Sequence, residues 1–203
     1  MRWFGGSKRE SEGGRSSGSA VPPGQVVTTK MPVMTIGQTP KVSQGVWRLN
    51  IAGLVVNPVE LDWDQFMAMP QITMDAEFHC VTQWSRMENT WSGVRVRDVI
   101  ELADASAQAK FAMVHCYDGY TTNMDLETLL ADDALLAHSH DGTPLSVEHG
   151  APVRLVLPSL YAWKSAKWLQ AIELTEKETP GFWEANGYHM RGDPWREERF
   201  RYH

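Results

Sequence analysis

Cysteine is scarce in this chain, and its scarcity excludes a disulfide framework. Only Cys80 and Cys116 occur among 203 residues, and neither has the close cysteine partner that a structural zinc motif requires. No apolar run approaches the roughly 20 residues that cross a bilayer, so we expect no transmembrane segment. The haem-attachment motif Cys-x-x-Cys-His and the nucleotide fingerprint Gly-x-Gly-x-x-Gly are also missing.

Excess positive charge is absent as well. The formal net charge is −6, and phosphate backbones attract clustered cations, so we expect no nucleic-acid partner. Residues 5–19 contain five glycines and five serines, which predicts a flexible tail over residues 1–25 and one domain over residues 26–203. The tail has no hydrophobic signal core and no twin-arginine pair, which favours a cytoplasmic protein.

Short strands outnumber helices in the hydrophobic pattern. Asp141-Gly142 lies between apolar stretches and predicts a hairpin turn. The other expected elements are strands over residues 46–51, 110–114 and 153–157, a helix begun by a capping box of Asp62 and Gln65, and helices over residues 98–103 and 125–131. Because strands and helices do not alternate regularly, we predict an α+β fold with a mixed sheet and no internal repeat.

One of the two cysteines lies at the end of an alternating run. Ile72, Met74, Ala76, Phe78 and Cys80 share one face, and polar residues occupy the other. This pattern predicts a half-buried strand that places the Cys80 thiol at a sheet edge. A single soft sulfur can bind a metal, attack a carbonyl or simply pack, and the spacing does not choose among these roles.

A second group of residues, in the carboxyl-terminal half, suits an anionic ligand. His149 and Arg154 flank the turn Gly150-Ala151-Pro152, and Ser165 and Lys167 follow. Glycine lets the backbone approach a ligand, and a guanidinium offers planar donors to a phosphate. Arg154 lies within an apolar strand, where an unpaired guanidinium would be costly, so this residue most needs a partner.

Three segments resemble, in order and spacing, the molybdopterin-binding domain of the sulfite oxidase superfamily: Cys80-Val81-Thr82, His149-Gly150-Ala151-Pro152-Val153-Arg154, and Lys164-Ser165-Ala166-Lys167-Trp168. The resemblance runs from about residue 32 to residue 195. It points to the short bacterial branch related to the catalytic subunit of the periplasmic methionine-sulfoxide reductase. It implies a sheet-rich fold of the sulfite oxidase type, a molybdenum–molybdopterin cofactor, and Cys80 as the catalytic metal ligand.

The resemblance also implies which residues bind the pterin and its phosphate. The matching positions are His149, Arg154, Ser165, Ala166 and Lys167. Thr35-Ile36-Gly37 occupies the place of a loop that contacts the pterin, although sulfite oxidases carry Arg-Asn-His there. Cys116 falls where the family pattern runs beside the pterin. Tyr161 and Trp163 are candidates for the wall of the pocket or for the core.

The residues after Cys80 depart from the sulfite oxidase pattern. Those enzymes continue with Ala-Gly-Asn-Arg-Arg, and the arginines help to form a cationic pocket for an oxyanion. Here residues 81–85 are uncharged, and Arg86 arrives only at the sixth position. We therefore expect a substrate other than sulfite, either neutral or larger.

The resulting hypothesis is a molybdopterin-dependent oxidoreductase that transfers an oxygen atom to or from a small molecule in a two-electron cycle. Its substrate, its direction and its electron donor or acceptor stay open. The alternatives are a cysteine-dependent hydrolase using Cys80, which needs an oriented base, and a non-catalytic cofactor-binding module. Irregular spacings disfavour copper bound by methionines and zinc bound by His79, His138, His140 and His149.

Overall fold

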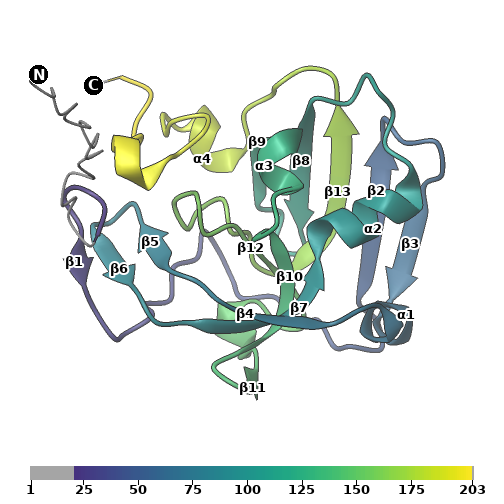
Figure 1. The fold of residues 1–203 in the computed structure, drawn as a ribbon, viewed down its shortest axis with the longest axis horizontal. Helices are drawn as coiled ribbons and strands as arrows, with labels where there is room; N and C mark the ends of the chain where they lie inside the picture. The colour runs from purple at the N-terminus through teal and green to yellow at the C-terminus, as the bar shows by residue number, and fades with distance from the viewer. Residues whose placement is uncertain (1–20, 203) are drawn as a thin grey trace, which may run out of the picture.

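Two five-stranded sheets and one three-stranded sheet form the framework of this computed structural model, which describes residues 21–202 (Figure 1). In the first sheet, β2 and β13 are parallel and every other pair is antiparallel. The predicted mixed sheet is therefore confirmed. The strand order is β3 (Val59–Asp62), β2 (Arg48–Gly53), β13 (Leu169–Thr175), β8 (Phe111–Cys116) and β9 (Thr121–Asp125).

The second sheet is antiparallel throughout. It contains β11 (Thr143–Pro144), β10 (Leu135–His140), β7 (Thr90–Arg95) and β4 (Ile72–Asp75) in that order, and β12 (Arg154–Val156) also pairs with β10. The predicted hairpin turn joins β10 to β11. Asp141 and Gly142 have φ values of 50° and 74°, the left-handed conformations that a tight two-residue hairpin turn requires.

The single strand predicted over residues 72–80 is wrong, because the structure divides it between two sheets. β4 belongs to the second sheet, whereas β5 (Phe78–Cys80) pairs with β6 (Trp84–Arg86), which also pairs with the short β1 (Val26–Val27). At the break, the Asn89 side chain donates to the Ala76 carbonyl, and the Asn89 backbone carbonyl accepts from the Ala76 amide. β5 is buried on both faces, so His79 is inside rather than exposed.

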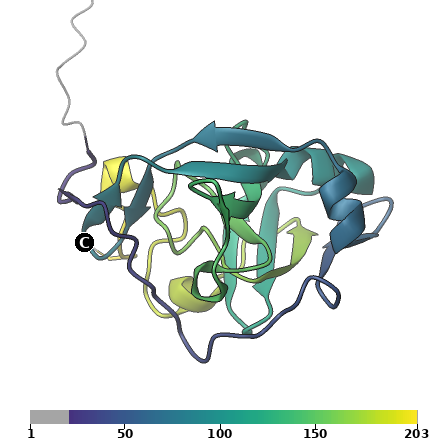
Figure 2. The same cartoon turned by 90° about the horizontal axis from the view of Figure 1, so that it is seen from below.

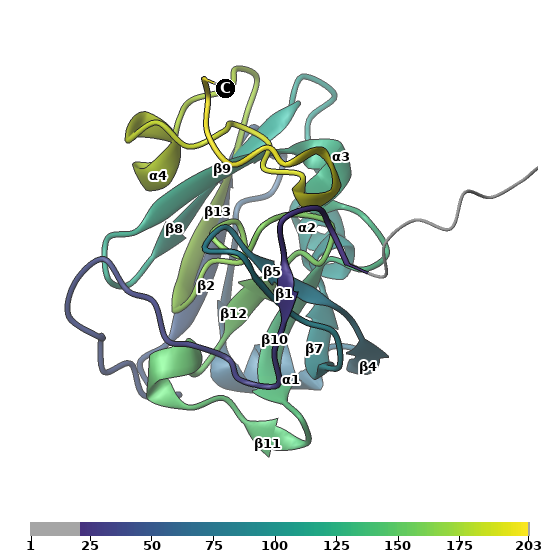
Figure 3. The ribbon, with the colours of Figure 1, turned by 90° about the vertical axis from the view of Figure 1, so that its left-hand side faces the viewer.

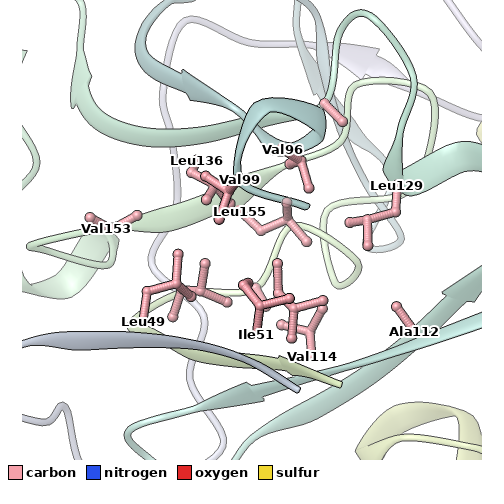
Figure 4. Close-up of a cluster of buried hydrophobic side chains, with 14 of the residues drawn as sticks. Leu49, Ile51, Val96, Val99, Ala112, Val114, Leu129, Leu136, Val153 and Leu155 are labelled. Atoms are coloured by element: carbon pink, nitrogen blue, oxygen red, sulfur yellow. The ribbon is translucent and has the colours of Figure 1, made fainter. Parts of the chain in front are cut away.

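The largest core cluster lies between the first sheet and the elements that cover it. Figure 4 shows side chains of β2 and β8 pointing toward those of α2 (Val96–Ala103), α3 (Leu126–Leu129), β10 and β12. The predicted helices near residues 98–103 and 125–131 are therefore confirmed. Asp62 and Gln65 form the predicted capping box at the start of α1 (Trp63–Ala68). Within residues 21–202, no helix is long and apolar enough to cross a membrane.

The amino-terminal end of the described chain lies beside β5 and β6 (Figure 3), and Arg199 near the carboxyl terminus donates to the Val81 carbonyl in the turn between these strands. The sequence assigns residues 21–25 to a tail, but the Gln25 side chain ties them to this region by donating to the Cys80 carbonyl. After β1, residues 28–46 form no helix or strand and run across the lower side of the molecule in Figure 2. The carboxyl-terminal segment contains α4 (Phe182–Ala185) and the short helix η2 (Pro194–Arg196).

A buried ion pair fixes the carboxyl-terminal segment to the rest of the domain. Lys164 Nζ lies 2.6 Å from Glu184 Oε1, and neither side chain is exposed to solvent. Glu184 Oε1 also accepts from the Thr122 hydroxyl and the Trp163 indole, and Lys164 donates to the Asn123 and Met190 carbonyls. These contacts join α4, β9 and the loop that contains residues 163–167.

We predict that breaking this pair by removing one partner strongly destabilises the protein. Lys164→Met or Glu184→Gln leaves a buried group without its counter-charge, and the free energy of unfolding should fall by about 3–5 kcal/mol. Urea denaturation followed by circular dichroism measures this loss. Lys110→Gln is the matched control, since Lys110 and Glu176 form an exposed pair at 4.0 Å and should contribute about 1 kcal/mol or less. Equal losses in all three variants would contradict this prediction.

Candidate active site

Cys80 ends β5 and begins a tight turn into β6. It pairs with Trp84 across the hairpin, and Gln83 takes a left-handed conformation with φ of 71°. The Cys80 side chain is 7% exposed and lines a cavity. Its Sγ lies 3.1 Å from the Thr82 hydroxyl. The fold therefore presents this sulfur to a ligand in the cavity.

Three nitrogen-bearing side chains reach the same cavity from the carboxyl-terminal half. His149 ends the short helix η1 (Val147–His149), Arg154 begins β12, and Lys167 lies in the loop before β13. Gly150 allows this convergence because its φ is 109° and a Cβ there would lie 3.0 Å from Cβ of Arg154 and 3.1 Å from Cβ of Lys167. The glycine is thus needed for the packing of these side chains as well as for the turn.

Arg154 carries a buried charge that lacks a counter-ion. Its guanidinium is in a residue only 3% exposed and donates to the carbonyl oxygens of Ser165 (2.8 Å) and His149 (3.1 Å). It also lies over the rings of Phe78 and Trp91, at 5.2 and 5.5 Å from their centroids. No carboxylate of residues 21–202 forms an ion pair with it. A buried cation in this state favours an anionic ligand.

Lys167 connects the cavity to the segment that crosses it. Its Nζ donates to the carbonyl oxygens of Met34 (2.7 Å) and Glu148 (2.9 Å) and lies 4.2 Å from the centroid of the Trp168 ring. Residues 31–36 consequently line the cavity. Ser165 and Ala166 also line it, and the buried Ser165 hydroxyl accepts from the Leu157 amide.

Burial lowers the pKa values of all three nitrogen-bearing groups. The pKa of Lys167 falls to about 8 and that of Arg154 to about 10, chiefly because burial disfavours their charged forms. Burial also lowers the pKa of His149, and the nearby Arg154 and Lys167 lower it further. At neutral pH these three groups are therefore two cations and a neutral imidazole, and Asp118, which also lines the cavity, acts against the lowering of the Lys167 pKa. An anion bound among them would relieve their repulsion.

The structure brings together most, but not all, of the residues that the sequence singles out. Those lining the cavity are Cys80, His149, Arg154, Ser165, Ala166, Lys167, Thr35, Ile36 and Trp163. Gly37 lies outside the lining, and its carbonyl accepts from the Thr35 hydroxyl. Cys116 is buried in the main core, where desolvation raises the pKa of its thiol. Tyr161 stacks behind Trp163 with ring centroids 5.4 Å apart.

Several lining residues were not predicted from the sequence. Tyr188 stacks on Trp183 at 4.8 Å and meets Trp163 edge-on at 5.0 Å, so these three rings form one aromatic wall. Asp118 and Tyr120 line the cavity from the turn between β8 and β9. The cluster of aromatic residues over 182–188 was visible in the sequence. Its position was not, because it depends on the buried Lys164–Glu184 contact.

The contacts of the described histidines do not support the hydrolase or zinc alternatives. Within residues 21–202, no imidazole hydrogen-bonds to the Cys80 sulfur, and His79 instead contacts Ser85 and Glu77. No group of three His, Cys, Asp or Glu in this part of the chain could hold a metal ion. His140, another of the four histidines considered as zinc ligands, is partly buried and stacks on Trp91 at 4.1 Å.

The donor set fits a phosphate-bearing pterin that carries a soft metal. Arg154 and Lys167 supply cationic donors to a phosphate, and Arg154 has no competing carboxylate. The thiol of Cys80 supplies a soft ligand on the wall of the same cavity. The aromatic rings between these groups supply flat surfaces for a fused ring system.

Comparison with known proteins gives one family and several relatives. Residues 36–183 match the oxidoreductase molybdopterin binding domain family. The chain is 45% identical to the uncharacterized oxidoreductase YuiH of Bacillus subtilis, over 98% of both chains. It is 30% identical to the protein-methionine-sulfoxide reductase catalytic subunit MsrP of Campylobacter jejuni, but that match covers 68% of this chain and 52% of the relative.

A solved structure supports the same fold. The sulfane dehydrogenase SoxCD of Paracoccus pantotrophus superposes with a TM-score of 0.63 at 22% identity, over 68% of this chain and 40% of that one. The predicted fold of the sulfite oxidase type is thereby confirmed. With the family match spanning most of the domain, the chain belongs to the oxidoreductase molybdopterin-binding domain family and is a molybdenum–molybdopterin-dependent oxidoreductase of the sulfite oxidase type.

Proposed function

We propose that this protein transfers an oxygen atom at a molybdenum centre ligated by Cys80. The observation that carries the proposal is that the Cys80 sulfur and the Arg154 guanidinium, which lacks a counter-ion, line one cavity. A soft ligand and a buried cation in the same cavity are what a phosphate-bearing molybdenum cofactor requires. Without an anionic cofactor, the desolvation free energy of that buried guanidinium would not be offset by any counter-ion within residues 21–202.

The residues of this chain divide the work of binding. Arg154 and Lys167 would bind the phosphate. The pterin would contact the other predicted residues that line the cavity, namely His149, Ser165, Ala166, Thr35 and Ile36. When bound, the cofactor supplies a metal that exchanges an oxygen atom with substrate while it gains or loses two electrons. The protein would hold the sulfur ligand in place and bury the reaction site, since the segment over residues 31–36 forms one side of the cavity lining.

The substrate that suits this cavity is neutral. The lining residues that flank Cys80 in the sequence are the uncharged Phe78, Val81, Thr82 and Trp84, and aromatic residues of the carboxyl-terminal segment line the same cavity. Arg199 does lie beside the turn, but its guanidinium donates to the Val81 and Pro23 carbonyls and lies over the Tyr161 ring. It therefore holds the backbone rather than lining the cavity. A sulfoxide or an amine N-oxide fits this environment better than sulfite.

Reduction is the direction that we propose. An organic oxide would lose its oxygen as water while taking up two electrons and two protons, and a separate donor protein would supply the electrons. The relative named as a methionine-sulfoxide reductase supports this direction. A cytoplasmic location, predicted from the sequence, is part of the same proposal.

We propose Tyr188 as the proton donor of that reaction. Its ring is held by Trp183 and Trp163, and its side chain lines the cavity. Burial raises the pKa of Tyr188, and the nearby Cys80 charge raises it further. The hydroxyl thus stays protonated at neutral pH and can donate a hydrogen bond to an oxygen atom near the metal.

We predict that Cys80→Ser abolishes turnover while most of the pterin stays bound, because phosphate anchoring does not depend on the sulfur. Turnover is measured with reduced viologen and a neutral sulfoxide or N-oxide, molybdenum by elemental analysis, and pterin by fluorescence after release. Cys116→Ala is the control, since Cys116 lies outside the cavity lining, and it should keep turnover and metal. Wild-type turnover in Cys80→Ser would refute ligation by Cys80.

We predict that anion binding weakens above pH 8 because Lys167 loses its charge there. Sulfate keeps a constant charge, so its affinity for cofactor-free protein should fall about tenfold between pH 7 and pH 9, where Arg154 stays charged, which is the value of one charge-assisted hydrogen bond. Titration calorimetry at fixed ionic strength measures this affinity. Lys167→Arg should remove the pH dependence, whereas Lys167→Met should bind weakly at both pH values. An unchanged wild-type affinity at pH 9 would exclude Lys167 from the anion site.

We predict that Tyr188→Phe lowers turnover about 100-fold or more, the usual contribution of a positioned proton donor. The substitution keeps the ring and its stacking, so molybdenum and pterin contents should match those of the wild type. Steady-state kinetics with the same oxide substrates measures the effect, and Tyr202→Phe is the control because Tyr202 is 87% exposed. A variant with wild-type turnover would remove Tyr188 from the reaction.

A further inference from the structure

The turn that follows Cys80 is held from three directions. Within the turn, the Gln83 amide donates to the Cys80 carbonyl at 3.1 Å. From the amino-terminal side, the Gln25 side chain donates to that same carbonyl at 3.1 Å. From the carboxyl-terminal side, Arg199 donates to the Val81 carbonyl at 2.6 Å. Two segments more than 170 residues apart thus fix the backbone of this turn.

Thr82 lies at the centre of this fixed turn, and its hydroxyl contacts the Cys80 sulfur. The distance from Thr82 Oγ1 to Cys80 Sγ is 3.1 Å, which is short for a hydrogen bond to sulfur. A free thiol and a hydroxyl can each donate. A sulfur that ligates a metal has no proton, so the hydroxyl must then be the donor.

The geometry points to Thr82 as a positioning residue that orients and tunes the sulfur of Cys80. The inference rests on the proposed function, because it concerns Cys80 as a metal ligand. A hydrogen bond to a thiolate withdraws electron density from the sulfur and so weakens its donation to the metal. Reduction of the metal then becomes easier, since hydrogen bonds to sulfur ligands help to set reduction potentials.

The chain offers a matched pair of substitutions at this position. Thr82→Val keeps the branched shape and removes the hydroxyl, whereas Thr82→Ser keeps the hydroxyl and removes a methyl group. Apart from its contact with the Cys80 sulfur, Thr82 is exposed to solvent. Neither substitution should therefore disturb folding. The held backbone keeps the serine hydroxyl within reach of the sulfur.

The experiment compares wild type, Thr82→Val and Thr82→Ser, each purified from cells that make the cofactor. Molybdenum and pterin contents are measured first. A redox titration followed by electron paramagnetic resonance then gives the midpoint potential and the spectrum of the half-reduced metal. We expect all three proteins to carry metal and pterin. Thr82→Val should show a more negative midpoint and an altered spectrum, and Thr82→Ser should match the wild type.

Two results would overturn the inference while leaving the proposed function intact. One is a Thr82→Val protein with the wild-type midpoint and spectrum. The other is a Thr82→Ser protein that shifts as far as Thr82→Val, because shape rather than the hydroxyl would then be responsible. Wild-type protein without molybdenum and pterin would instead refute the proposed function, on which the inference depends.

Discussion

Burying the Arg154 guanidinium without a carboxylate beside it is the constraint on which the site depends. The side chain is satisfied by the carbonyls of His149 and Ser165 and by two aromatic rings, none of which neutralises its charge. Removing a cation from water in this way costs several kcal/mol unless a negative partner is supplied. The cavity beside Arg154, which Lys167 also lines and where Gly150 permits the close packing of both residues, leaves space for that partner.

The sulfur end of the cavity is organised by the ends of the described chain. Gln25 and Arg199 bind neighbouring carbonyls of the Cys80 turn, and the Lys164–Glu184 pair fixes the aromatic wall opposite. A metal ligand gains from such preorganisation because its geometry is set before the metal binds. The cationic residues Arg154 and Lys167 and the Cys80 sulfur are thus held by different parts of the sequence, and all three line one cavity.

Local patterns in the sequence predicted much of the fold. The capping box at Asp62 and the turn at Asp141-Gly142 were predictable because their chemistry involves adjacent residues. The strand over residues 72–80 was wrongly predicted as continuous, since the break involves Asn89, a residue of the connection between β6 and β7. Alternation also misplaced His79, because the second face of β5 is covered by segments distant in sequence.

Cys80, His149, Arg154, Ser165 and Lys167 could be selected from residue type and spacing together with the family resemblance. Tyr188 and Trp183 could not be selected, because a buried ion pair rather than a motif brings them to the cavity. Gly37 and Cys116 show the opposite case, since their positions along the sequence suggested a lining that the packing does not provide.

The central claim is that Cys80 adds a protein sulfur to the metal held by the pterin. X-ray absorption at the molybdenum edge tests it most directly, on protein purified from cells that make the cofactor. We expect a shell of sulfur scatterers around the metal that loses one member in the Cys80→Ser variant while the pterin sulfurs remain. Identical sulfur shells in the two proteins would contradict ligation by Cys80 and leave the cavity as a pterin site alone.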